Sequence, residues 1–154
     1  MGRINISHFE KDLLTYSHVG LDSMCFIYLF ENNPSFSPLA ETLLNLMGKK
    51  KISGVTSTVT LVETFVLPER MNNQLLIVEY EKIFAHLPNL ELVSIDWRVS
   101  RLAAKLRAAY KTLRTPDAIQ VAATLLRGYP AFVTNDEKLQ KIKELKILLL
   151  KDYL

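Results

Sequence analysis

The amino-acid sequence predicts an α/β fold, in which a mostly parallel sheet of four to five strands is covered by helices on both sides. Short apolar runs alternate with segments of helical period along most of the 154 residues. The connections are short and helices stand between successive strands, which is typical of parallel sheets. Hydrophobic residues make up 49% of the chain, so we expect residues 1–154 to form a single domain around one core.

Five short segments have the composition of strands. Each contains Val, Ile, Leu or Phe and is bounded by polar residues or proline, as expected where strands end in turns. The expected strands, in order, are 18–21, 52–57, 90–95, 131–133 and 145–150. Residues 1–17 precede them as a polar N-terminal leader.

Capping residues and helix breakers indicate where the helices between these strands begin and end. The expected helices are 23–31, 39–47, 58–67, 74–86, 97–113, 116–127 and 137–143. Gly48 and Gly128 are expected to end the second and the sixth of them, and Pro68 the third. Asn72–Asn73 and Asp96 are expected to cap the N-termini of the fourth and the fifth.

The helix after Asp96 is amphipathic and basic. With Arg98 set at zero and about 100° per residue, its apolar residues fall within an arc from about 20° to about 140°. Cations occupy both flanks of that arc: Arg98, Arg101 and Lys105 on one side, and Arg107, Lys111 and Arg114 on the other. One face therefore packs on the core and the remainder is a solvated surface or a contact for a polyanion.

Composition excludes several classes of protein. The single cysteine, Cys25, cannot form an internal disulfide, and this favours a reducing compartment, so we expect a cytoplasmic protein. The N-terminal residues contain no apolar signal-peptide core, and no run approaches the roughly 18 apolar residues of a membrane span. A formal net charge of +3 permits a polyanionic partner but does not require one.

Four acidic residues stand at positions where parallel sheets bind ligands, beyond the carboxyl ends of strands. Asp22 directly follows a strand, and Glu63 interrupts an apolar helical run, so we expect it to face inward or across a cleft. For these two the sequence shows no capping role, and acids in apolar surroundings are usually paired or ligating.

The other two acids have structural explanations as well as functional ones. Asp117, in the first turn of its helix, is favoured there by the helix dipole. Asp136 follows a strand and is equally suited to a turn or an N-cap. Asp96 also follows a strand, but its capping role explains it better than a ligand role does.

Carboxylates drawn from four separate segments predict a site for a hard cation. Mg²⁺ or Mn²⁺ accepts all-oxygen coordination, whereas zinc prefers His or Cys in local clusters, which this chain lacks. Such a site can activate a water molecule and stabilise charge on a phosphodiester. A basic surface nearby would hold a nucleic-acid backbone, and all six cations of residues 98–114 could provide it. Arg114 is singled out among them because it lies three residues before Asp117.

In this arrangement the chain resembles the PIN-domain ribonucleases, especially the VapC-like toxins of toxin–antitoxin pairs. The segments that carry the resemblance are Gly20-Leu21-Asp22-Ser23, Thr60-Leu61-Val62-Glu63, Leu113-Arg114-Thr115-Pro116-Asp117-Ala118-Ile119 and Val133-Thr134-Asn135-Asp136. The order of these segments is more specific than any one of them. Gln120 stands where members of the family often carry His.

The resemblance implies a PIN-like fold and a nuclease that depends on Mg²⁺ or Mn²⁺ and hydrolyses RNA, such as transfer or ribosomal RNA. It implies that Asp22, Glu63, Asp117 and Asp136 bind the metal or orient the attacking water. Thr134, with Ser23 and Asn135, would support these acids, and Arg114, Lys111 and Arg107 would bind RNA. It also implies a homodimer and a small antitoxin protein whose tail can enter the active site.

Two other functions compete with the nuclease. A PIN-like module could bind RNA or a protein without cutting, although the complete set of four acids argues against it. A phosphohydrolase could use Asp22 as a nucleophile, but such enzymes normally need a second acid two residues later, where this chain has Met24.

Overall fold

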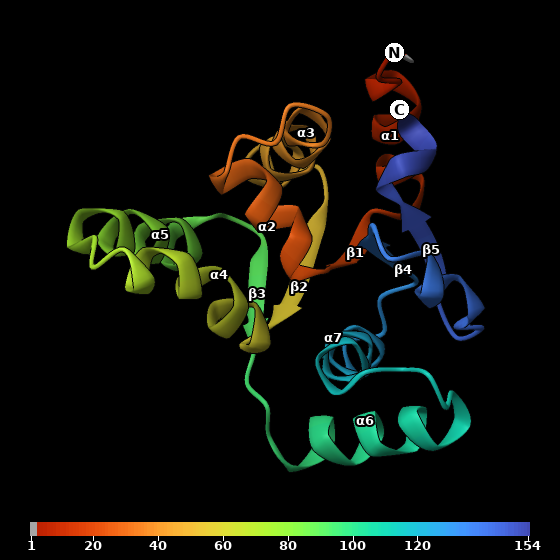
Figure 1. Cartoon of the computed structure of the whole chain (residues 1–154). Coiled ribbons are helices and arrows are strands. Elements are labelled where there is room, and N and C mark those ends of the chain that lie inside the picture. The colour runs from red at the N-terminus through yellow and green to blue at the C-terminus, as the bar shows by residue number, and fades with distance from the viewer. Residues whose placement is uncertain (1–2) are drawn as a thin grey trace.

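Five parallel strands form the central sheet of the protein, as Figure 1 shows for the computed structural model, which describes residues 3–154. The strands are β1 (His18–Leu21), β2 (Ser53–Ser57), β3 (Leu90–Val93), β4 (Ala131–Thr134) and β5 (Lys146–Leu149). Their spatial order is β3-β2-β1-β4-β5, and every neighbouring pair is parallel. The α/β class and all five expected strands are confirmed.

Helices occupy most of the connections between these strands. The α-helices are α1 (Ile6–Tyr16), α2 (Ser23–Phe30), α3 (Ser37–Gly48), α4 (Val59–Arg70), α5 (Gln74–His86), α6 (Trp97–Ala109) and α7 (Thr115–Leu126). Two short 3₁₀ helices follow, η1 (Glu137–Lys141) and η2 (Leu150–Tyr153). Among residues 3–154, no helix is both long enough and apolar enough to span a bilayer.

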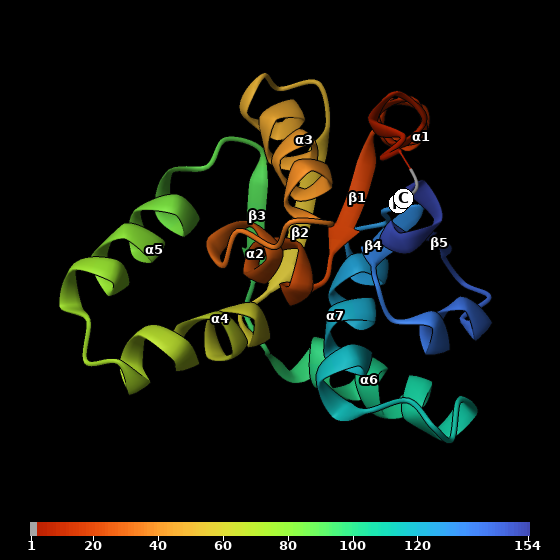
Figure 2. The same cartoon turned by 45° about the horizontal axis from the view of Figure 1, so that its top comes forward.

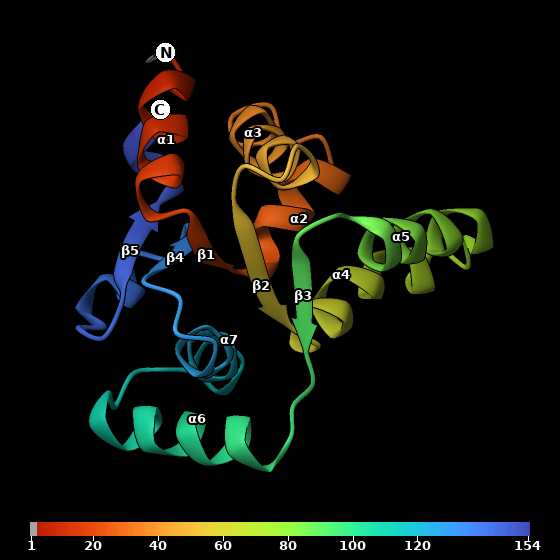
Figure 3. The same ribbon diagram turned by 180° about the vertical axis from the view of Figure 1, so that it is seen from behind.

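The strand order explains why helices cover both faces of the sheet. The chain moves outward from β1 to β2 to β3 through α2 to α5, then returns past β1 to β4 through α6 and α7. Crossovers between parallel strands are right-handed, so reversing the direction of travel places the next helices on the opposite face. Figure 2 shows α2 and α3 on one side of the strands, and Figure 3 shows α6 beyond α7, away from the sheet.

Alternate residues of the strands pack against the helices on the two opposite faces of the sheet. Val19 and Leu21 of β1 belong to the apolar cluster that includes α1, α2 and α3. Phe132 of β4 belongs to the cluster of α6 and α7. Gly20 faces α7, and a Cβ atom built there would overlap the side chain of Thr124 and lie 2.8 Å from the Phe132 ring. Glycine therefore lets α7 approach the sheet closely at this point.

The expected polar leader is instead largely a helix that packs on the core. Within it, α1 buries Phe9 and Leu13 completely, and the side chain of Asn5 caps it by accepting from the backbone N–H of His8. Residues 1–2 lie outside the described part of the chain. Two buried residues at i and i+4 form too narrow an apolar stripe to stand out in an otherwise polar segment.

Two expected helix ends are also wrong. Pro68 does not end α4, which continues to Arg70, because a proline so near the C-terminus removes a single hydrogen bond from the last turn. The helix after Asp96 ends at Ala109 rather than near residue 113, since Tyr110 leaves helical geometry at φ −119° and ψ 92°. Its hydroxyl donates to Glu144 Oε2 at 2.8 Å, which anchors the side chain away from the helix.

Candidate functional site

The candidate site lies at the carboxyl edge of the sheet, where β1 and β4 are adjacent. The connection from β1 leads to β2 on one side, whereas β4 lies on the other, so this is a topological switch point. Open parallel sheets bind ligands in the crevice that such a point creates. Asp22 directly follows β1, and its backbone N–H donates to the carbonyl of Val133 in β4 at 3.0 Å.

Asp22 is a buried carboxylate held between two hydroxyls. Asp22 is 6% exposed and precedes the first turn of α2, yet its side chain makes no capping hydrogen bond. Oδ2 accepts from the Thr134 hydroxyl at 2.7 Å, and the Ser23 hydroxyl lies 3.4 Å from Oδ1. Hydroxyl groups do not neutralise a buried negative charge. The charge of this carboxylate is therefore uncompensated, and a bound cation would compensate it.

The raised pKa of Asp22 reflects this uncompensated buried charge. The pKa of this carboxyl is raised from 3.8 to about 6; burial is the largest cause, the hydrogen bond from Thr134 opposes it, and the negative charges of Asp117 and Glu63 add to it. The Coulombic effects also show that these three carboxylates share one electrostatic environment.

Glu63 approaches Asp22 from α4. Of the two expected placements it does not face inward, but it lines a small hollow between α2 and α4 together with Ile27 and Leu67. The residue is exposed, but its Oε1 accepts from the hydroxyl of Ser23 at 2.9 Å. Glu63 therefore reaches across to the first turn of α2, and Ser23 stands between the two carboxylates.

Asp117 occupies the position that the helix dipole explains, and it also lines a small hollow together with Asp136. It lies in the first turn of α7, as the dipole argument requires, and it is buried. Burial raises its pKa, and the Arg114 guanidinium, whose Nε donates to Asp117 Oδ2 at 3.1 Å, opposes that rise.

Asp136 has a capping role, yet it also joins the site through Thr134. Its Oδ1 accepts from the backbone N–H of Lys138 at 3.0 Å, which caps η1. Its own backbone N–H donates to the Thr134 hydroxyl at 3.1 Å, and that hydroxyl donates in turn to Asp22. Asp136, Asp117, Arg114 and Lys138 line one small hollow.

These side chains are connected without being a closed cage. Within residues 3–154, no three His, Cys, Asp or Glu side chains are close enough together to hold an ion. Magnesium is usually held by one or two carboxylates while water fills the other positions, so an open set of oxygens suits it. Asp22, buried and without a cationic partner, is the donor that fits best, with Glu63 and Asp117 as neighbours.

The comparisons with known proteins agree with this topology. A model of the PIN domain matches residues 19–145. The chain belongs to the PIN-domain family. This family consists in general of nucleases, and its match includes all four candidate acids. A comparison with the curated proteins finds no match.

Solved structures share the fold at low sequence identity. DNA-bound VapBC from Salmonella typhimurium is 19% identical, with a TM-score of 0.68 over 86% of this chain and 98% of that one. A toxin–antitoxin complex from Klebsiella pneumoniae is 19% identical, with a TM-score of 0.64 over 86% and 97%. FitAcB from Neisseria gonorrhoeae is 14% identical, with a TM-score of 0.63 over 86% and 98%. The PIN-like fold is thereby confirmed.

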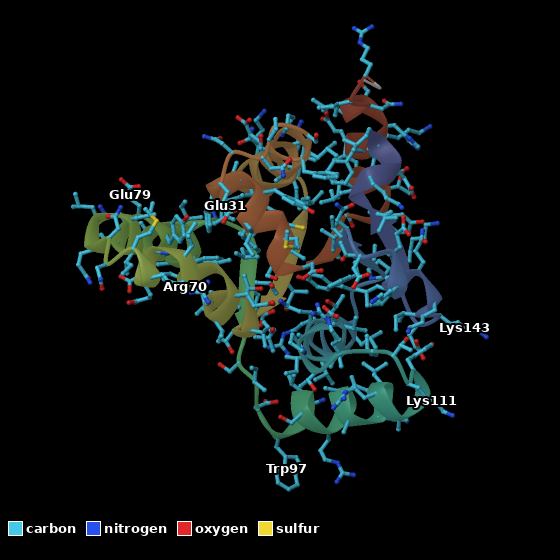
Figure 4. All side chains as sticks on the ribbon, in the orientation of Figure 1. Glu31, Arg70, Glu79, Trp97, Lys111 and Lys143 are labelled. Carbon is cyan, nitrogen blue, oxygen red and sulfur yellow. The ribbon has the colours of Figure 1, made fainter. Side chains whose placement is uncertain are left out.

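The expected RNA-binding residues of this PIN domain do not all lie at the site. Arg114 does, through its bond to Asp117. Arg107 Nε donates to the carbonyl of Leu113 at 3.2 Å and so holds the connection between α6 and α7. Lys111 is exposed and extends outward beyond the end of α6, as Figure 4 shows.

Asn135, expected to support the acids, instead connects neighbouring elements of the PIN domain. Its Nδ2 donates to the Tyr28 hydroxyl at 2.9 Å, and its Oδ1 accepts from the backbone N–H of Lys151 at 3.0 Å. It therefore fixes the segment after β4 relative to α2 and η2.

Sequence reasoning missed a buried polar network behind the acids, centred on Gln120 of α7. Gln120 Oε1 accepts from the Ser57 hydroxyl at 2.8 Å and from the Ser57 backbone N–H at 3.0 Å. Its Nε2 donates to the Thr60 hydroxyl at 2.8 Å. The network ties α7 to the end of β2 and to the turn of α4 that precedes Glu63. A glutamine in an apolar helical run was the available signal.

Cys25 is a buried core residue. It is fully buried, and its thiol lies 3.6 Å from the carbonyl of Val133. Burial raises the pKa of the thiol well above its ordinary value, which suppresses the reactive thiolate.

Proposed function

We propose that this PIN domain is a divalent-metal-dependent endoribonuclease, and that it is the toxin of a toxin–antitoxin pair in the cytoplasm. The buried carboxylate of Asp22 carries the proposal. It lies at the switch point of a nuclease-family fold and accepts hydrogen bonds from the Thr134 hydroxyl and the Ser23 backbone but, in the described part of the chain, from no cation. It is also close enough to Asp117 and Glu63 for their charges to act on it. A site of this charge would bind a hard cation.

The residues of the site fall into three proposed roles: binding the metal and activating water, orienting Asp22, and contacting the phosphate backbone. Asp22 and its carboxylate neighbours would hold Mg²⁺ or Mn²⁺, which supplies positive charge at the scissile phosphate and lowers the pKa of a water molecule. Thr134 fixes the orientation of Asp22 through the 2.7 Å bond. Glu63, Asp117 and Asp136 would bind the metal or accept the proton of the attacking water. Arg114, mostly exposed beside Asp117, would contact the phosphate backbone.

Cleavage of a mixed pool of transfer and ribosomal RNA tests the proposal. We expect fragments in the presence of Mg²⁺ or Mn²⁺, and none with a chelator or with Asp22→Asn. Asp96→Asn is the matched control, because Asp96 also follows a strand and caps a helix but lies outside the site. Full metal-dependent activity in Asp22→Asn would overturn the assignment of the site.

An apolar groove on the α4–α5 hairpin is the proposed docking surface for the antitoxin. The hairpin projects from the sheet in Figure 1, and its groove of about 630 Å³ is lined by Leu61, Phe65, Ile77 and Phe84 among others. Three of the solved structures are toxin–antitoxin or VapBC complexes by their names. Glu69 and Glu81 also line the groove, so an amphipathic helix with basic flanks would complement it.

Binding of the protein encoded beside this chain tests the partner. Val62 lines the groove and is 68% exposed, so Val62→Asp should block binding without disturbing the core. Val78→Asp serves as the control, because Val78 is exposed on α5 but does not line the groove. Equal binding by both variants would contradict the proposed surface. We also propose that the chain forms a homodimer, as the family resemblance implies, and sedimentation of the chain alone would test this.

A further inference from the structure

The outer surface of α6 carries an exposed tryptophan beside three arginine and lysine side chains. Trp97 is 80% exposed, and Arg98, Arg101 and Lys105 are exposed as well. Trp97, Arg101 and Lys105 follow one another at i, i+4 and i+8, so they form one row along the helix. We call these four residues the α6 ridge. Figure 4 shows Trp97 pointing away from the body of the molecule.

The ridge contributes little to the fold. The side of α6 that packs on α7 consists of Val99, Ala103 and Leu106, which lie on the opposite side of the helix. Within residues 3–154, none of the three cations of the ridge forms a salt bridge. These three cations are therefore available to a ligand in the part of the chain that the structure describes.

The charged residues of the segment that starts at Trp97 are all cations, and the exposed Asp96 directly precedes it as the N-cap of α6. Residues 97–114 contain six arginine and lysine residues and no aspartate or glutamate. The same segment ends at Arg114, which contacts Asp117 of the candidate site.

We propose that the α6 ridge binds single-stranded RNA outside the catalytic site, with an unpaired base stacked on Trp97 and phosphates on Arg101 and Lys105. Exposed aromatic side chains stack on unpaired bases, and neighbouring cations follow the backbone. The inference rests on the proposed function only in taking RNA as the substrate. The 13 residues of α6 span about 20 Å, so about six stacked nucleotides cover it.

A second copy of this chain is a poorer occupant of the ridge. A two-fold interface would place the ridge against itself and bring like charges together, with no acid in residues 97–114 to compensate them. Duplex nucleic acid is also a poorer occupant, because its bases are already stacked on one another.

Trp97 is the only tryptophan in the chain, so its fluorescence reports on the ridge alone. The experiment uses the full-length Asp22→Asn protein with a chelator, so that RNA is not cut. An unstructured, labelled RNA of about 12 nucleotides, twice the length that covers α6, is titrated and followed by anisotropy. The Trp97 emission is followed in parallel titrations with the same RNA without its label.

We expect saturable binding with quenching of the Trp97 emission. Trp97→Ala should weaken binding at least fivefold by anisotropy. Arg101→Gln/Lys105→Gln should reduce the slope of log affinity against log salt by about 1.4, for two lost phosphate contacts. Lys49→Gln/Lys51→Gln removes the same charge next to the start of β2, away from the carboxyl edge, and should leave Trp97 quenching unchanged.

Several outcomes would overturn the inference. RNA that binds by anisotropy without altering the Trp97 emission would refute the ridge while leaving the nuclease proposal standing. A Trp97 signal that depends on protein concentration without RNA would identify a second copy as the occupant. No RNA binding by any variant would remove the support for both proposals.

Discussion

Replacing Asp22 by asparagine should stabilise the metal-free protein at neutral pH. The folded structure raises the pKa of this carboxyl from 3.8 to about 6, chiefly by burial. A shift of about 2 pH units corresponds to about 3 kcal/mol of free energy that the ionised carboxylate costs the folded state. The asparagine side chain is uncharged and similar in size, so the variant avoids that cost. An unsatisfied amide N–H would offset part of the gain, which leaves about 1–3 kcal/mol.

The pH dependence distinguishes this cause from a change in packing. Below pH 3.8 the carboxyl is protonated in both the folded and the unfolded state, so the wild-type protein and the variant should be equally sensitive to denaturant. Between pH 3.8 and about 6 the unfolded protein has lost the proton while the folded wild-type protein keeps it, so the free energy of unfolding of the wild type should fall relative to that of the variant and level off above about 6. The difference should be complete near pH 7.

Urea unfolding from about pH 3 to pH 8 in the presence of a chelator measures this difference. Asp96→Asn is the control, because the Asp96 side chain caps α6 by accepting from the N–H of Val99 at 2.9 Å and asparagine caps equally well. The control should differ from wild type by less than about 0.5 kcal/mol at every pH. A gain in Asp22→Asn that is constant across pH, or a loss at pH 7, would refute the reasoning.

Four further changes test other parts of the structure. Gly20→Ala should lower the free energy of unfolding by about 2 kcal/mol or more, because its methyl group would overlap Thr124; an unchanged melting temperature would contradict this contact. Gln120→Leu should cost about 3 kcal/mol in chemical unfolding by leaving buried hydroxyls and an N–H without partners, and a neutral result would dismiss the network. Leu13→Ala should cost about 2–4 kcal/mol if α1 packs as described, whereas a loss below about 1 kcal/mol would show that α1 contributes little. Arg114→Ala in the Asp22→Asn protein should weaken RNA binding about fivefold. An unchanged salt dependence of RNA binding would show that Arg114 is a solvated surface residue that makes no phosphate contact.

The strands and the positions of the site acids could be predicted because both depend on local pattern. Alternating strands and helices specify a parallel sheet, and its carboxyl edge is where Asp22 and Asp136 must lie. The first turn of α7, which holds Asp117, follows from its Thr-Pro start. The order of the four acids in the chain then suggested the family that the match over residues 19–145 confirms.

Other features depend on contacts between distant segments and could not be predicted. The helix α1 is held by Phe9 and Leu13 against the core, and the Tyr153 hydroxyl at the far end of the chain donates to Asp12 at 2.7 Å. The end of α6 is set by Tyr110, whose partner Glu144 lies 34 residues later. No local periodicity reports such contacts.

The orientations of the side chains at the site also could not be predicted from the sequence. The sequence places Glu63 on a helix after β2, but its exposure depends on how α4 rotates against α2. The hydroxyl of Ser23 between Glu63 and Asp22 is a consequence of that rotation. The roles of Asn135 and Arg107 as structural ties likewise depend on partners in other elements.

Binding of Mn²⁺ in the absence of RNA tests the central claim most directly, because it requires neither the correct substrate nor the partner. Electron paramagnetic resonance of free Mn²⁺ counts the ions that each protein removes from solution. The account predicts saturable binding by the wild-type protein and by Asp96→Asn, competition by Mg²⁺, and loss of binding in Asp22→Asn. Equal Mn²⁺ binding by the wild-type protein and Asp22→Asn would contradict a metal site at the carboxyl edge of this sheet.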